Sequence, residues 1–212
     1  MLRLKSFVFS PIQENTYLLY NEMGDCIIID PGCYFREEEA ELDQFISDNQ
    51  LKPRLLLNTH CHLDHVFGNK YVAEKYGLIP HIHPKEKQLL DYAPTSGLIY
   101  NMPFDNYTGT LAYITPGEPI KLGADELMPL FTPGHSPGSI SFHCAQQQFI
   151  VSGDVLFYHS IGRTDLPGGN LETLLESIRK ELFSLPDETV VHSGHGPQTS
   201  IGEERRNNPF LQ

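Results

Sequence analysis

Short runs of apolar residues, bounded by proline, glycine or polar turn residues, recur along the chain and predict β-strands. The pattern predicts strands at residues 2–10, 16–20, 25–30, 55–57, 79–82, 126–131, 139–144, 148–152 and 189–192. Ile27, Ile28 and Ile29 are consecutive and β-branched, which is typical of a strand covered on both faces. We therefore expect a sheet that lies between other layers.

Apolar residues at helical spacing predict helices at residues 35–49, 63–76 and 170–182, with a short one after Pro84. The clearest is 170–182, where Asn170 can cap an amphipathic stretch of leucines and an isoleucine. Strands and helices follow one another in two successive sets. The pattern therefore predicts an α/β fold with a four-layer αββα sandwich.

Residues 91–113 show no periodicity and collect Pro94, Gly97, Pro103 and Gly109 among aromatic residues. We expect a long loop that covers a site. Beyond the last strand the chain reads as a glycine-rich turn and a polar tail. The length of 212 residues predicts a single domain over 1–212 with a covering loop at 91–113.

The formal charge of −12, from 15 Lys and Arg against 27 Asp and Glu, disfavours nucleic acid as a partner. The sequence contains no apolar run of about 18 residues, so no membrane span is expected. The four cysteines form no CxxC pair, which favours reduced thiols and a cytoplasmic protein. The 10 histidines still require an explanation.

The segment 59–65, THCHLDH, places three histidines and one aspartate directly after a predicted strand. Side chains at i and i+2 of an extended segment point the same way, so His60 and His62 can bind one ion. Asp64 and His65 follow as the chain turns into a helix, which suits a second ion beside the first. Histidines that simply face solvent in a loop are the alternative.

Three further ligand types, His135, Asp154 and His195, stand beside glycines in turns that follow predicted strands. Glycine lets the backbone bend sharply and brings a neighbouring side chain close to an ion. Taken singly, each fits an ordinary turn residue. With the first cluster they make seven ligands, enough for two metals that share a carboxylate.

The order HxHxDH, then a lone His, a lone Asp and a lone His, resembles the metallo-β-lactamase fold superfamily from about Asn15 to Gly196. The resemblance implies two metal sets that share one bridging residue: His60, His62 and His135 for the first ion, Asp64, His65 and His195 for the second, and Asp154 as the bridge. It also implies that Asp30 supports the ligand loop, unless Asp30 is an ordinary turn residue.

The best-known class of true β-lactamases lacks a histidine at the position of His65, has a cysteine where Asp154 stands, and is exported. The stretch 162–169, GRTDLPGG, and the tail from Glu204 to Leu211 instead resemble the short, glyoxalase II-like (hydroxyacylglutathione hydrolase-like) branch. Full-length glyoxalase II adds a C-terminal helical domain that contacts glutathione. Its absence from this chain leaves the thiol carrier open.

Four residues are candidates for substrate binding, each with a structural alternative. Arg163 can bind a carboxylate through its planar guanidinium or pair with Asp165. His159 lies near that stretch and can line the pocket. Tyr100 and Tyr107 can contact substrate or pack within the covering loop. The remaining histidines, including the pair His81 and His83, are expected to be structural rather than metal ligands.

The resemblance implies a dinuclear metal-dependent hydrolase of a small glutathione-type thioester, with S-lactoylglutathione giving lactate and glutathione. A hydroxide bridging two divalent ions, zinc first and iron or manganese as alternatives, would attack the carbonyl carbon. Asp64 would orient it and Asp154 would hold both ions. The alternative is a persulfide dioxygenase-like oxidation of glutathione persulfide at one iron held by His60, His135 and Asp154. A metal-binding module without activity is the third.

Overall fold

The computed structural model describes residues 1–212, which form two compact units. The first unit comprises Met1–Tyr113 and Lys121–Asp125, and the second comprises Ile114–Ile120 and Glu126–Gln212. The units are described one at a time below. The single domain expected over 1–212 stays a prediction.

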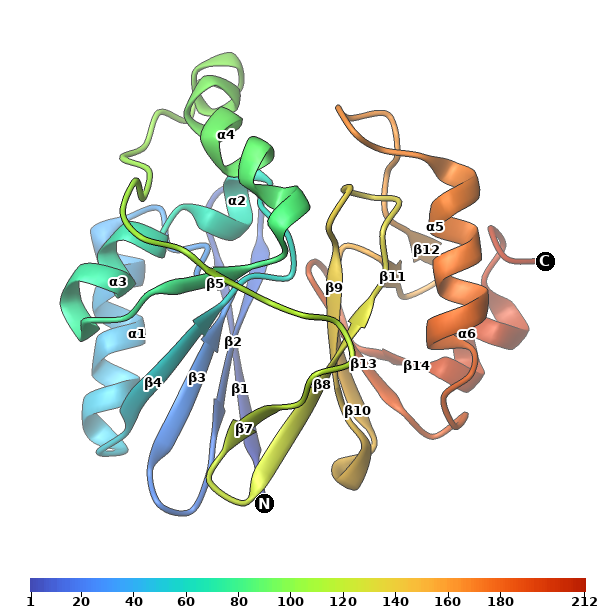
Figure 1. The fold of residues 1–212 in the computed structure, drawn as a ribbon, viewed down its shortest axis with the longest axis horizontal. Helices are drawn as coiled ribbons and strands as arrows, with labels where there is room; N and C mark the ends of the chain where they lie inside the picture. Colours follow the sequence, from blue (N-terminus) through green and yellow to red (C-terminus); the bar gives the residue numbers. More distant parts are fainter. The chain divides into compact units, whose positions relative to one another are not determined.

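The first unit is built on a six-stranded sheet in the order β1-β2-β3-β4-β5-β6 (Figure 1). Its strands are β1 (Arg3–Phe9), β2 (Glu14–Tyr20), β3 (Asp25–Ile29), β4 (Lys52–Leu57), β5 (Pro80–Ile82) and β6 (Ala112–Tyr113). The first three pair antiparallel, and β3 to β6 run parallel. The parallel strands point their carboxyl ends to one edge, where the loop after β4 begins.

Two helices, α1 (Arg36–Asp48) and α3 (Asn69–Tyr76), cover one face of this sheet (Figure 1). Leu42 of α1 and Val72 of α3 pack with Ile28 and Leu56 of the sheet in one buried cluster. The helix predicted at 35–49 is confirmed by α1.

The helix predicted at 63–76 is divided into α2 (Leu63–Val66) and α3. The break has a local cause at Gly68, whose N–H donates to the carbonyl of Pro31 at 2.7 Å. A Cβ at Gly68 would overlap the sulfur of Cys33. The chain therefore passes too close to residues 31–33 for one continuous helix with larger side chains.

The prediction of an irregular segment at 91–113 is wrong at both ends, because it begins within a helix and ends in β6. A 3₁₀ turn, η1 (Pro84–Glu86), leads into α4 (Lys87–Ile99), which contains Pro94. Pro94 stands eight positions into the helix, and Leu90 and Ala93 are buried beside it. Packing of this apolar face holds the helix despite its proline. Residues 100–111 have no regular structure.

The second unit is built on a six-stranded sheet in the order β14-β13-β10-β9-β8-β7. Its strands are β7 (Ile120–Leu122), β8 (Asp125–Phe131), β9 (Ile140–Cys144), β10 (Phe149–Gly153), β13 (Val190–Ser193) and β14 (Thr199–Ser200). A separate hairpin joins β11 (Leu156–Phe157) and β12 (Ser160–Ile161), and a 3₁₀ turn, η2 (Ala145–Gln147), links β9 to β10. Strands β10 and β13 run parallel, which brings their carboxyl ends side by side.

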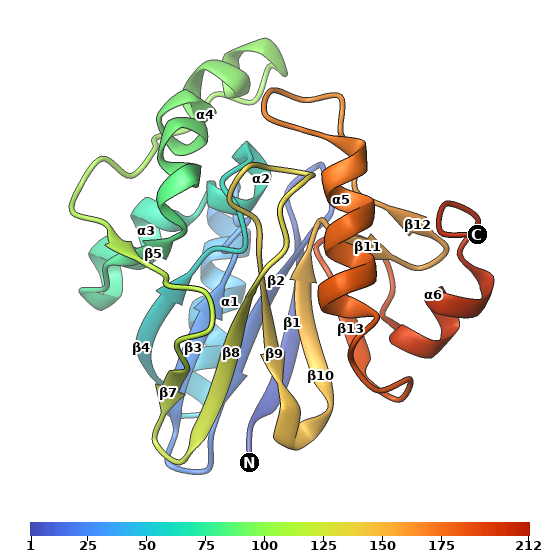
Figure 2. The same ribbon diagram turned by 45° about the vertical axis from the view of Figure 1, so that its right-hand side comes forward.

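Helix α5 (Leu171–Ser177) continues as a π-helical turn, η3 (Ile178–Leu182), and covers this sheet (Figure 2). Leu174, Ile178 and Leu182 pack against Ile150 and Val191. The predicted cap is confirmed, because the side chain of Asn170 accepts a hydrogen bond from the N–H of Thr173 at 2.8 Å.

The polar tail, for which no helix was predicted, contains a further helix, α6 (Ile201–Asn207). Its apolar content is low, but the side chain of Ser200 caps it and Ile201 is buried against the core of this unit. Neither the cap nor the burial of Ile201 can be read from the apolar pattern of this segment. No helix of the protein is long and apolar enough to cross a membrane.

Candidate metal centre

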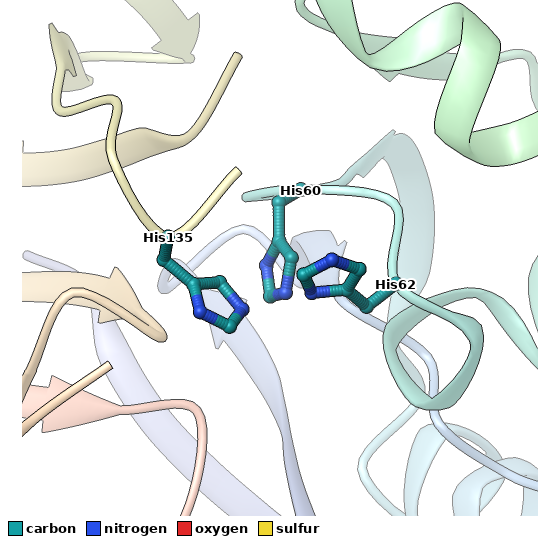
Figure 3. A group of neighbouring side chains, drawn as sticks. All are labelled: His60, His62 and His135. Carbon is teal, nitrogen blue, oxygen red and sulfur yellow. The ribbon is translucent and has the colours of Figure 1, made fainter. Parts of the chain in front are cut away.

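In the first unit, four predicted ligands lie in the loop after β4 and at the start of α2. His60 and His62 place their rings 4.8 Å apart, and His65 lies 4.0 Å from His60 between ring centroids. Figure 3 shows His60 on the loop and His62 where the chain enters the helix, with their imidazoles edge to face. Asp64 lies with one carboxylate oxygen 3.7 Å from Nε2 of His65. The alternation inferred from the sequence therefore brings His60 and His62 together.

Asp30, at the end of β3, ties this loop to the sheet. Its carboxylate accepts hydrogen bonds from the N–H of Thr59 at 2.7 Å and the hydroxyl of Thr59 at 2.5 Å. It also lies 3.1 Å from Nδ1 of His65, so a carboxylate acceptor holds the proton on Nδ1. The Nε2 of His65 is thus the nitrogen with a lone pair, which is the form a metal binds. These contacts give Asp30 the supporting place that the resemblance implied.

Behind Asp30 a second carboxylate, Glu14, is fully buried. It accepts a hydrogen bond from the hydroxyl of Thr16 at 2.8 Å, and burial raises its pKa well above the usual range. A Cβ at Gly32 would overlap the Glu14 carboxylate, so only glycine admits this close approach. The buried Glu14 carboxylate therefore lies in close contact with the backbone at Gly32.

In the second unit, the parallel strands β10 and β13 end next to each other and place Asp154 beside His195. One carboxylate oxygen of Asp154 lies 3.6 Å from Nε2 of His195 and 3.5 Å from Nε2 of His135. His135 lies in the loop that follows β8 and is drawn in Figure 3. The two predicted histidine ligands of this unit therefore converge on the carboxylate of the third predicted ligand, Asp154.

The segment after β12 supports two of these ligands. Nδ1 of His135 donates to the carbonyl oxygen of Arg163 at 2.8 Å, which leaves Nε2 with its lone pair toward Asp154. A Cβ at Gly162 would overlap the carbonyl oxygen of Asp154. The glycine of the GRTD stretch is therefore needed for the backbone to pass the ligand turn.

The donor set in each unit fits divalent metal ions. Imidazole nitrogens and carboxylate oxygens are ligand types for zinc, iron and manganese. His65 and His135 have Nδ1 held by a protein acceptor and present Nε2, the arrangement that second-shell partners impose on metal-binding histidines. The first unit thus supplies His60, His62, Asp64 and His65, and the second His135, Asp154 and His195. Their roles as ligands stay predictions.

The predicted substrate residues of the second unit already have protein partners. Arg163 pairs through two hydrogen bonds, at 2.7 and 2.6 Å, with the carboxylate of Asp165, as its structural alternative proposed. This contact lowers the pKa of Asp165 to about 2. His159 stacks on Tyr158 and lies 2.8 Å from a carboxylate oxygen of Glu203.

The two tyrosines of the first unit differ in exposure. Tyr100 ends α4 and is about half exposed, whereas Tyr107 packs against the core and donates its hydroxyl to the carbonyl of Thr110 at 2.9 Å. Tyr107 therefore adopts the packing role that stood as its alternative. Neither contact tests a role in substrate binding.

Sequence reasoning missed the polar residues that surround Asp30. Thr16, Asn58 and Thr59 are buried, and Asn58 donates to the carbonyl of His65 at 2.9 Å. Asn58 and Thr59 directly precede the histidine cluster in the sequence, and that position could have indicated a supporting role. Glu14 stands far from any motif, so nothing in the sequence pointed to it.

Residues 10–195 match the family model of the metallo-beta-lactamase superfamily. Over 95% of this chain and 93% of its own length, the probable metallo-hydrolase YqgX of Bacillus subtilis is 41% identical. Hydroxyacylglutathione hydrolase GloC of Haemophilus influenzae is 37% identical over 94% of this chain and 93% of its own.

Solved structures extend the similarity to the fold. The B3 metallo-beta-lactamase BLEG-1 is 37% identical, with a TM-score of 0.91 over 99% of this chain and 100% of that one. TTHA1623, solved in a di-iron-bound form, is 35% identical, with a TM-score of 0.88 over 98% of this chain and 100% of its own. The predicted α/β fold of the metallo-β-lactamase type is confirmed, and the chain belongs to the metallo-beta-lactamase superfamily as one of its metallo-hydrolases.

Proposed function

We propose that this metallo-hydrolase cleaves a small glutathione-type thioester, with S-lactoylglutathione as the first substrate to test. The observation that carries the proposal is the 37% identity with hydroxyacylglutathione hydrolase GloC across 94% of the chain. The donor set supports it, because it contains every ligand that the sequence motif requires. Partners other than a small molecule are not proposed, and the charge of −12 argues against nucleic acid.

In this proposal the two units supply ligands to a pair of divalent ions, zinc or, as in TTHA1623, iron. His60, His62 and His135 would hold the first ion, Asp64, His65 and His195 would hold the second, and Asp154 would be shared. Such a pair, when bound, lowers the pKa of water toward neutrality and polarises a carbonyl. Asp64 orients the attacking water through its carboxylate.

No protein nucleophile is needed for this reaction. Cys61 stands between the proposed ligands His60 and His62 in the sequence. Its side chain is buried in an apolar cluster with Ile82 and Leu90, so we assign it to packing. The departing thiolate needs no strong general acid, because thiols have pKa values near 8.5. All four cysteines are free and buried, which supports our proposal of a reducing, cytoplasmic compartment.

Substrate binding is proposed for exposed side chains of both units. Arg163 can exchange Asp165 for a substrate carboxylate, since this ion pair is more than half exposed on both sides. His159, Tyr100 and Tyr107 are the further contacts we propose. Arg163→Lys should raise KM more than it lowers kcat, because a lysine lacks the planar bidentate fork.

The test is metal quantification on protein purified without added metal, run beside hydrolysis of S-lactoylglutathione. We expect two divalent ions per chain and turnover, with both lost in Asp154→Ala. Asp48→Ala, which removes an exposed carboxylate on α1, is the control and should change neither. Thioesterase activity retained in Asp154→Ala would refute the proposed site.

Two other outcomes would replace the proposal. One iron per chain with oxygen uptake on glutathione persulfide would support the dioxygenase-like alternative. Hydrolysis of a β-lactam is the second candidate, favoured by the 37% identity with BLEG-1, and it is measured in the same preparations. A protein that holds two ions and cleaves β-lactams but no thioester would favour that candidate.

A further inference from the structure

Glu86 is a fully buried carboxylate that the proposed chemistry does not use. It belongs to η1, yet one of its oxygens accepts the backbone N–H of Cys61, 25 residues earlier, at 2.8 Å. Cys61 is the residue between His60 and His62. Glu86 therefore contacts the peptide between His60 and Cys61, next to a proposed ligand.

The turn that carries Glu86 is itself fixed. The side chain of His83 accepts a hydrogen bond from the N–H of Lys85 at 3.3 Å. The backbone carbonyl of His83 accepts one from the N–H of Glu86 at 2.9 Å. Pro84 occupies the first position of the turn, where its missing N–H costs nothing. His83 is thus a cap residue, in agreement with the structural role expected for it.

The side chain of Cys61, on the other side of this contact, is packed among apolar residues. Cys61, Ile82 and Leu90 belong to one buried cluster, and burial together with the Glu86 charge raises the pKa of the Cys61 thiol. A buried carboxylate is costly unless it accepts hydrogen bonds, and an apolar residue in its place would leave the N–H of Cys61 without this acceptor. This hydrogen bond also restricts the orientation of the peptide that Glu86 contacts.

We propose that Glu86 is a positioning residue, which fixes the peptide plane between His60 and Cys61 and thereby orients the imidazole of His60 relative to His62. The inference rests on the proposed role of these two histidines as ligands. Turning that peptide would swing the imidazole of His60, because the Cα of His60 and the Cα of Cys61 flank it. A charge-assisted hydrogen bond resists such a turn more strongly than a neutral one.

The first experiment uses the metal-free protein and reports on the hydrogen bond itself. Amide hydrogen exchange at Cys61, followed by NMR, should accelerate roughly tenfold or more in Glu86→Leu, because a hydrogen bond to a charged acceptor is lost. Glu86→Gln keeps an oxygen acceptor and should restore most of the protection. Unchanged exchange in Glu86→Leu would overturn the inference.

The second experiment reports on the ligands. Cobalt(II) is bound in place of the native metal, its visible spectrum is recorded, and its affinity is measured against a competing chelator. Glu86→Leu should shift the bands and weaken binding by about 10- to 100-fold, the usual effect of removing an outer-shell partner, while Glu86→Gln stays near wild type.

Glu204→Leu is the matched control, because Glu204 is also a fully buried glutamate that accepts a backbone N–H, from His159 at 2.9 Å. It should lose stability without moving the cobalt spectrum or Cys61 exchange. If Glu86→Leu does not fold, Glu86→Asp, which withdraws the acceptor by one methylene, takes its place with the same expectations.

The outcomes separate the two proposals. Wild-type protein that binds no cobalt would overturn the proposed metal centre and this inference with it. Wild-type protein that binds cobalt, with an identical spectrum and affinity in the Leu or Asp variant, would overturn only the role of Glu86.

Discussion

At the scale of single residues, the ligand loop is held by acceptors that fix which histidine nitrogen carries the proton. Asp30 does this for His65 and the carbonyl of Arg163 does it for His135. Thr59 extends the network, since its hydroxyl donates to Asp30 and lies 3.1 Å from Nδ1 of His60. Buried polar contacts of this kind favour one arrangement of the ligands over others.

Thr59→Val should lower the free energy of unfolding by about 1.5–3 kcal/mol, because Asp30 loses a buried donor while the volume is kept. Metal affinity should also fall, since Nδ1 of His60 loses its neighbouring hydroxyl. Thr59→Ser keeps the hydroxyl and should recover most of both. Urea unfolding and chelator competition measure the effect, and a valine variant as stable as wild type would contradict it.

His192 on β13 gives the protein a pH dependence outside the ligand set. Burial lowers its pKa to about 4, below the value near 6.5 expected in the unfolded chain. The unfolded state therefore takes up a proton first, and stability present above pH 6.5 is lost as the pH falls toward 4.

Removing this histidine should flatten that part of the stability curve. Between pH 6.5 and pH 4, the free energy of unfolding should fall by roughly 1–3 kcal/mol less in His192→Leu than in wild type. Urea unfolding across this range measures the difference. Equal losses in the two proteins would show that other groups carry the acid sensitivity.

At the scale of elements, prediction succeeded where a local signal and the tertiary packing agree. Helices α1 and α5 and most strands were predicted because their apolar spacing matches the face that they bury. Only the start of α4 was predicted, as a short helix after Pro84, and α6 was missed. Pro94 interrupts the helical pattern of α4, and a run of charged residues conceals that of α6. The packing of their buried residues stabilises both helices.

The cap of α5 offers a test at this scale. Asn170→Ala should lower the free energy of unfolding by about 1 kcal/mol, because the N–H of Thr173 loses its acceptor. Asn170→Asp retains an oxygen in the same place and should match wild type. Thermal unfolding followed by circular dichroism distinguishes them, and an alanine variant with unchanged Tm would contradict the capping role.

At the scale of the whole molecule, the charge of −12 and the ligand set act together. Buried carboxylates that lie close together repel one another, and bound divalent cations would relieve that cost. Metal binding to the folded state alone therefore raises stability by mass action.

Removing metal should lower the melting temperature. Binding at a hundredfold excess over Kd contributes about 2.7 kcal/mol per site, and each kcal/mol shifts Tm by about 2–4 °C in a chain of this size. Dialysis against a strong chelator should thus lower Tm by at least about 5 °C, and added zinc or iron should restore it. Asp154→Ala should show no such difference between metal-treated and chelated samples.

The sequence by itself determined the α/β class, the family and the identity of the candidate ligands. Ligand motifs are local, and their residue types and spacing are written in the chain. Only the tertiary structure decided which polar residues support them, because Asp30, Glu14 and Glu86 lie on other elements and reach Thr59, His65 and Cys61. Burial and hydrogen bonding depend on what the fold brings together, and no local pattern records the partner across the core.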